Sequence, residues 1–132
     1  MYEIVVGIDR NENRARAQAT ELVEMPLDRE ATHVTLVHDF EDNPEAATVT
    51  QVGSVRRARE ILEDAGIAVS LEGRTGEPAA ELLAVADECD ADLLVVGGRK
   101  RSPAGKALFG SVTQQVVLGT ERPVLVCSDR TA

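Results

Sequence analysis

Aromatic residues are almost missing from this chain of 132 residues, which has no Trp and only Tyr2, Phe40 and Phe109. Hydrophobic residues nevertheless make up 43% of the sequence, so the core must be built from Val, Leu, Ile and Ala. Aliphatic runs of this kind are typical of a parallel sheet that is covered on both faces. The length suits one domain spanning residues 1–132.

Several other features are scarce or absent. The two cysteines, Cys89 and Cys127, lie far apart in apolar patterns and form no C-x-x-C pair, which predicts buried thiols in a reducing compartment. The first residues lack the basic region and long apolar core of a secretory signal, and no apolar run has the length of a membrane span. We therefore expect a cytoplasmic protein that makes no membrane contact.

Lysine is also scarce, since only two of the fourteen basic residues are Lys, against 23 acidic residues and a net charge of −9. Without a distributed basic face, the chain is not expected to bind nucleic acid. A strongly acidic surface is typical of proteins adapted to high salt, because salt screens the repulsion between carboxylates. Our hypothesis is a halophilic source.

Acidic residues are missing altogether between Asp92 and Glu121. This stretch begins with an apolar, strand-like run at 93–96 that ends in Gly97-Gly98, and it later contains Gly110-Ser111. Its basic residues are Arg99, Lys100, Arg101 and Lys106. A buried strand that runs into a glycine turn, with a helix start beyond it, is typical of phosphate binding. A basic surface loop would have the same composition, and the pattern alone leaves both readings open.

Apolar runs and helical spacings alternate along the chain. Strands are expected at 4–9, 33–38, 67–72, 93–96 and 123–127. Helices are expected from Asn11 or Asn13 to about 27, over 47–65 up to Gly66, from Pro78 onward, around 103–109, and from Ser111 to Gly119. Ser111 and Gln114 have the spacing of a capping box. The alternation predicts an α/β fold with right-handed crossovers, in which a doubly wound, open, parallel sheet lies between two helical layers.

Ligands of such sheets bind beyond the carboxyl ends of the strands, where the strand order reverses. If the first strand lies beside the fourth, Asp9 and Gly97 emerge at the same crevice. The segment from Gly97 to Ser111 would then surround the phosphates.

Short motifs along almost the whole chain are similar to those of one family. They are Val5-Val6-Gly7-Ile8-Asp9, Leu36-Val37-His38, Gly76-Glu77-Pro78-Ala79, Ala91 to Gly97, Phe109-Gly110-Ser111-Val112, and Arg122 to Val126. With these motifs in this order, the sequence resembles the universal stress protein family. The resemblance implies a five-stranded parallel sheet with strand order 3-2-1-4-5.

One branch of that family binds ATP through a loop of the form G-x-x-G, nine residues, then G-S or G-T. Gly97, Gly110 and Ser111 match this pattern, whereas Lys100 stands where the second glycine is expected. The resemblance implies that Asp9, Gly97, Lys100, Gly110, Ser111 and Val112 bind ATP or another adenine nucleotide, with or without Mg²⁺. The Lys100 ammonium would either contact the phosphates or fill the anion site. Asp39, at an expected apolar position near the adenine, suits the base only if its carboxylate turns away.

Structural roles are open for the same residues. Asp9 and Ser111 can cap helices, and Gly97 and Gly110 can serve turns that need positive φ. His33 and His38 have no partners at metal-ligand spacing, and no catalytic or metal-binding set stands out.

Two functions follow from these observations. The first is a stress-response protein that senses or regulates by binding an adenine nucleotide, with at most slow hydrolysis because no general base or arginine finger is evident. The second is a nucleotide-free, dimeric interaction module that binds protein partners. In either case the apolar edge strand Val124 to Cys127 predicts a homodimer, since pairing with its own copy would cover the edge.

Overall fold

The computed structural model describes residues 1–43, 45–98 and 110–128. Its strands are β1 (Tyr2–Gly7), β2 (Thr32–Asp39), β3 (Ala68–Arg74), β4 (Leu93–Gly98) and β5 (Val124–Ser128). Its α-helices are α1 (Glu12–Glu24), α2 (Gly53–Asp64), α3 (Pro78–Cys89) and α4 (Ser111–Gly119), with short 3₁₀ turns η1 (Arg29–Ala31) and η2 (Val49–Gln51). The expected helix around 103–109 lies outside the described residues.

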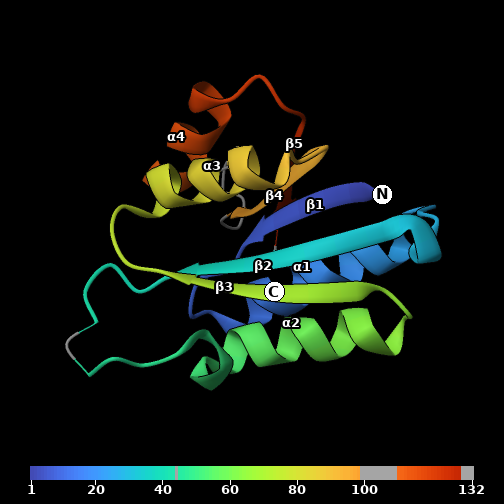
Figure 1. Cartoon of the computed structure of the whole chain (residues 1–132), viewed down its shortest axis with the longest axis horizontal. Helices are drawn as coiled ribbons and strands as arrows, with labels where there is room; N and C mark the ends of the chain where they lie inside the picture. The colour runs from blue at the N-terminus through green and yellow to red at the C-terminus, as the bar shows by residue number, and fades with distance from the viewer. Residues whose placement is uncertain (44, 99–109, 129–132) are drawn as a thin grey trace, which may run out of the picture.

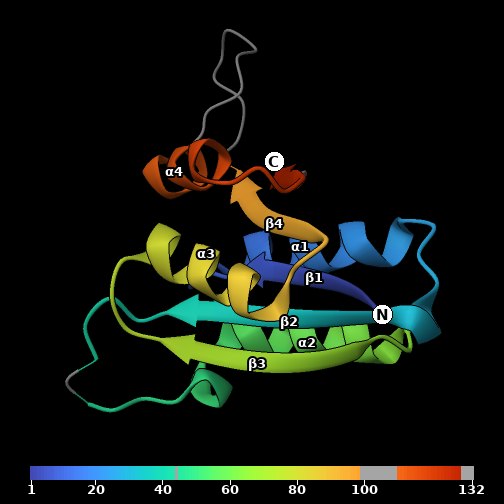
Figure 2. The same ribbon diagram turned by 45° about the horizontal axis from the view of Figure 1, so that its top comes forward.

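The five strands form one parallel sheet in the order β3-β2-β1-β4-β5. Figure 2 shows four of them in sequence, from β3 at the bottom through β2 and β1 to β4. Val5 of β1 stands opposite Leu94 of β4 on one side and Thr35 of β2 on the other. The strand order therefore reverses between β1 and β4. The predicted α/β fold class and strand order are confirmed.

Two aliphatic cores hold the helices to the two faces of the sheet. On one face, Ile4 and Val6 of β1 pack with Ala19 and Leu22 of α1 and with residues of α2. On the other face, Val5 packs in a second core with residues of α3 and α4. Figure 1 shows α3 and α4 above the sheet and α2 below it. Because side chains alternate along each strand, the continuous apolar run of β1 supplies both cores.

Two expected helix bounds were wrong. α1 ends at Glu24 rather than near 27, because Met25 adopts an extended conformation (φ −71°, ψ 149°), as the residue before a proline prefers. The helix expected over 47–65 begins only at Gly53. The 3₁₀ turn η2 precedes it and has its own capping box between Thr48 and Gln51. The expected single helix is therefore divided into a short turn and α2.

The predicted end of α2 at Gly66 is confirmed by its positive φ of 85°, since only glycine adopts that conformation without strain. Pro78 occupies the first turn of α3, as expected. Within the described part of the chain, no helix combines the length and apolar character that a membrane crossing requires.

Candidate functional site

A cavity of about 640 Å³ opens at the carboxyl ends of β1, β2 and β4, where the strand order reverses. Its volume lies in the range of small-molecule sites. Its walls come from the segments after β1 and β2 and from the first turns of α1, α3 and α4. The sequence-predicted residues that line it are Asp9, Gly97, Gly110, Ser111 and Val112. Lys100, Arg99, Arg101 and Lys106 lie outside the described residues.

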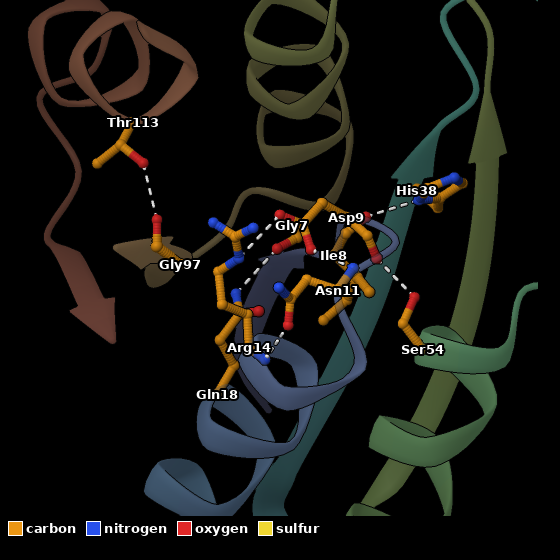
Figure 3. Close-up of polar contacts among 10 residues, drawn as sticks. All are labelled: Gly7, Ile8, Asp9, Asn11, Arg14, Gln18, His38, Ser54, Gly97 and Thr113. Atoms are coloured by element: carbon orange, nitrogen blue, oxygen red, sulfur yellow. Dashed lines mark hydrogen bonds and ion pairs between the residues drawn. The ribbon is translucent and has the colours of Figure 1, made fainter. Parts of the chain in front are cut away.

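Asp9 follows β1 and has a partner for each carboxylate oxygen. Oδ1 accepts a hydrogen bond of 2.9 Å from the backbone N–H of Asn11, and Oδ2 lies 3.2 Å from Nε of Arg14 (Figure 3). The backbone carbonyl of Asp9 accepts a 2.5 Å hydrogen bond from the hydroxyl of Ser54 on α2. Asn11, not Asp9, caps α1 by accepting from the N–H of Arg14. The loop is therefore fixed from both sides while the Asp9 side chain stays 56% exposed.

Gly97 and Gly110 do not serve positive-φ turns, so that structural explanation is wrong. Gly97 lies within β4, Gly110 has a φ of −72°, and neither is among the described glycines with positive φ. A Cβ at Gly97 would lie 3.4 Å from Cδ of Arg14 and 3.6 Å from Oε1 of Gln18, which is ordinary van der Waals contact. Glycine thus keeps this wall of the cavity thin.

The amino end of α4 faces the cavity. Gly110 is its N-cap and Ser111 its first residue, with no side-chain capping bond. The expected capping box at Ser111 was therefore wrong, because the chain is already helical there and the extended position falls one residue earlier. The first backbone N–H groups of a helix have no intrahelical acceptor and carry its positive dipole end. Here they belong to residues that line the cavity, which makes this end suitable for an anion.

Asp39 lies at the other end of the cavity, on the rim. Its Oδ1 accepts hydrogen bonds from the backbone N–H groups of Glu41 (2.6 Å) and Gly76 (3.2 Å), while Oδ2 is buried without a partner among the described residues. The carboxylate thus fastens the loop after β2 to the segment before α3. Nearby Arg74 lies among Glu72, Glu81 and Glu88, and the hydrogen bond with Glu88 raises the pKa of its guanidinium.

Sequence reasoning missed two side chains of α1 that line the cavity, Arg14 and Gln18. Gln18 is 1% exposed, and its Nε2 donates a 2.9 Å hydrogen bond to the carbonyl of Gly7. A usable signal existed, because these two polar residues are four apart and therefore share a helical side. That side adjoins the buried stripe of Ala15, Ala19 and Leu22.

A buried histidine also lines the cavity. Nδ1 of His38 donates a 2.7 Å hydrogen bond to the carbonyl of Ile8, Nε2 is buried without a partner among the described residues, and the ring packs edge-on against Phe40. Among the described residues, no group of three or more His, Cys, Asp or Glu side chains is placed to hold a metal ion. The helix amides and two arginines, Arg10 and Arg14, suit a ligand that carries negative charge. The same cavity is also lined by the acidic residues Asp9, Asp39, Glu41 and Asp42.

Comparison with known proteins gives consistent results along the chain. The model of the universal stress protein family matches residues 1–128. A universal stress protein of Mycolicibacterium smegmatis is 40% identical over 80 residues, which cover 60% of this chain and 62% of that protein. The matched segment thus spans less than two thirds of that relative's length.

Solved structures match over nearly the full length. A universal stress protein from Archaeoglobus fulgidus has 28% identity and a TM-score of 0.78, covering 96% of this chain and 98% of its own. A universal stress protein solved in complex with cAMP has 26% identity and a TM-score of 0.71, covering 97% of both chains.

Proposed function

The chain belongs to the universal stress protein family, and from this premise we propose that it binds an adenine nucleotide in the cavity between β1 and β4. In this proposal it acts in the cytoplasm as a single domain over residues 1–132, and it senses or regulates the stress response. The observation that carries the proposal is that Asp9, Gly97 and the amino end of α4 line one cavity.

The parts of the cavity suit different parts of a nucleotide. The amides of Gly110, Ser111 and Val112 and the Ser111 hydroxyl are placed at the positive end of α4, where phosphate is favoured. The Asp9 carboxylate lines the same cavity and can accept from a ribose hydroxyl. Lys100, outside the described residues, is proposed as a further phosphate contact. A relative with 26% identity was solved with cAMP, a nucleotide that has the same base, ribose and phosphate chemistry.

Rapid catalysis is not part of the proposal. Both oxygens of the Asp9 carboxylate already have partners in Asn11 and Arg14, so this carboxylate is poorly placed to activate a water molecule. Hydrolysis of ATP should be slow at most. A turnover rate in the range of typical kinases would contradict this part of the proposal.

Isothermal titration calorimetry with ATP, ADP and AMP in high salt tests nucleotide binding. The diagnostic variant is Gly110→Asp, because Asp is itself a good N-cap and should keep α4 while its carboxylate repels phosphate. Gly53→Asp is the matched control, since it adds the same charge at the first position of α2, where a new Cβ meets nothing within 4 Å. We expect binding by the wild type and Gly53→Asp and its loss in Gly110→Asp. No heat with any nucleotide at millimolar concentration would overturn the proposal.

We further propose a homodimer that pairs through β5. This strand lies at the edge of the sheet and is bonded on one side to β4, while Val124, Leu125 and Val126 are only half-buried. Antiparallel pairing with the same strand of a second copy about a two-fold axis would cover them. A monomer mass by light scattering in molar salt would contradict this.

The second candidate function is a nucleotide-free interaction module. The observation that favours it is the apolar surface of α4, where Val117 and Leu118 are exposed, Leu118 by 86%. A stable dimer that gives no calorimetric signal with any nucleotide would support this alternative.

A further inference from the structure

Arg14 stands at a position that is unfavourable for helix stability. It is the third residue of α1, which begins at Glu12 after the cap residue Asn11. The positive end of the helix dipole lies at this turn and favours acidic side chains there, while it disfavours cations. The helix alone therefore gives no reason for an arginine here. The surroundings of its side chain supply one.

The Arg14 side chain crosses from α1 into the proposed phosphate end of the cavity. Its Cδ passes 3.4 Å from the Cβ position of Gly97, and its Nε lies 3.2 Å from Oδ2 of Asp9. Figure 3 shows the guanidinium between Gly97 and Asp9. A Cβ at Gly97 would meet this arginine at ordinary van der Waals distance, so the two residues are close neighbours in the cavity wall.

Only part of the guanidinium is engaged. Of its N–H groups, Nε–H faces Asp9 at ion-pair distance without hydrogen-bond geometry, and within the described residues Nη1 and Nη2 have no acceptor. A guanidinium offers five N–H donors in a planar fork that matches phosphate oxygens. The Arg14 side chain is 30% exposed, so its remaining donors are open to a ligand in the cavity.

The ion pair between Asp9 and Arg14 also affects whether Asp9 can coordinate a divalent cation. Asp9 is one of four acidic residues that line the cavity, with Asp39, Glu41 and Asp42, and both of its carboxylate oxygens already have partners. A Mg²⁺ ion coordinated by Asp9 would have to displace Arg14 or share its oxygen with it. The cation and the guanidinium would then repel each other at short range. The residues present therefore do not fit a protein-bound Mg²⁺ at Asp9.

We propose that Arg14 takes the place of a divalent cation in this site. It neutralises Asp9 and donates hydrogen bonds to the phosphates, so the nucleotide binds without Mg²⁺. This inference rests on the proposed function, because it concerns how the same cavity holds its ligand. It assigns to α1 a phosphate contact that is separate from the amides of α4.

The test is calorimetry with ADP on the full chain, in EDTA and then in excess MgCl₂. The variants are Arg14→Gln, which keeps a good helix former and removes the charge, and Arg14→Lys, which keeps the charge without the fork. Arg16→Gln is the matched control, because Arg16 is exposed on the same helix and is not part of the cavity wall. Urea unfolding of each variant checks that the fold is retained.

For the wild type we expect binding in EDTA and no lower Kd in excess MgCl₂, because Mg²⁺ complexes free ADP in solution and competes with the protein for it. Arg14→Gln should bind roughly tenfold to a hundredfold more weakly in EDTA, as expected for a lost charge-assisted hydrogen bond, and Mg²⁺ should recover part of the loss. Arg14→Lys should fall between, and Arg16→Gln should match the wild type.

Two results would overturn the inference while leaving nucleotide binding intact: a wild type that binds only with Mg²⁺, or an Arg14→Gln variant that binds as tightly as the wild type in EDTA. A wild type that binds no nucleotide in either condition would instead remove the proposed function itself.

Discussion

The hydroxyl of Thr113 in α4 donates a 2.8 Å hydrogen bond to the carbonyl oxygen of Gly97 in β4. Thr113 is buried, so this bond ties the first turn of α4 to the strand end that forms a wall of the cavity (Figure 3). This hydrogen bond therefore fixes the position of the α4 amides relative to Gly97.

Removing that hydroxyl should weaken both the fold and the site. Thr113→Val keeps the branched shape, and we expect it to lower the free energy of unfolding by about 1–2 kcal/mol, because the Gly97 carbonyl loses its donor. Urea unfolding measures this change, and calorimetry should show weaker nucleotide binding in parallel. Thr113→Ser, which keeps the hydroxyl, is the control and should retain the affinity. Equal affinity for the Val variant and the wild type would show that α4 is positioned by other contacts.

Two glycines at opposite ends of α2 should respond to alanine with opposite signs. Gly66 has a φ of 85° and no atom within 4 Å of a new Cβ, so Gly66→Ala should cost about 1 kcal/mol from backbone strain alone. Gly53 is equally open but lies at the start of the helix without positive φ. Gly53→Ala should therefore stabilise by about 0.5–1 kcal/mol, since it lowers the entropy of the unfolded chain. Urea unfolding of both variants is the measurement, and changes of the same sign would contradict the prediction.

Arg122 connects the segment before β5 to the end of α3. Its Nε donates to the carbonyl of Ala91 at 2.9 Å, and its Nη1 donates to Asp87 at 2.7 Å. Lysine lacks this fork, so Arg122→Lys should lower the free energy of unfolding by about 1 kcal/mol, mainly through the lost bond to the carbonyl. Arg57→Lys, at an exposed ion pair with Glu60 on α2, is the control and should change stability by less than about 0.5 kcal/mol. Thermal or urea unfolding separates the two.

The sheet could be predicted from sequence because its signals are local and repeated. Five apolar runs separated by helical spacings leave few topologies, and the resemblance to one family supplied the strand order. The pairing of β1 with β4, in which Val5 lies opposite Leu94, confirms that order. The end of α2 at Gly66 and the start of α3 near Pro78 could be predicted for the same reason, because each residue acts through its own backbone conformation. These features need no knowledge of distant residues.

The remaining errors have tertiary or competing local causes. A positive-φ turn was one of the readings left open for Gly97, and it was wrong because this residue lies within β4. The approach of Arg14 and Gln18 to Gly97 is a tertiary contact between α1 and β4. Ser111 has the spacing of a capping box, yet Gly110 takes the cap position. Arg14 was not among the expected site residues, although its spacing from Gln18 indicates a shared side of the helix. Its meaning appears only when Asp9 is placed beside it.

The strongly acidic composition leads to a prediction about salt. With a net charge of −9, repulsion between carboxylates destabilises the compact state in dilute buffer, and added salt screens it. We expect the urea midpoint to rise with KCl and, if the protein is adapted to high salt, to keep rising into the molar range.

Glu24 provides an internal probe of this salt effect, because it is exposed at the last residue of α1, where a negative charge opposes the helix dipole. Glu24→Gln should stabilise by about 0.3–1 kcal/mol in dilute buffer and by much less in molar KCl. A wild-type urea midpoint that does not change with KCl would contradict the hypothesis of salt adaptation. If the midpoint stops rising at the KCl concentration where the difference between Glu24→Gln and the wild type disappears, ordinary screening explains the whole effect.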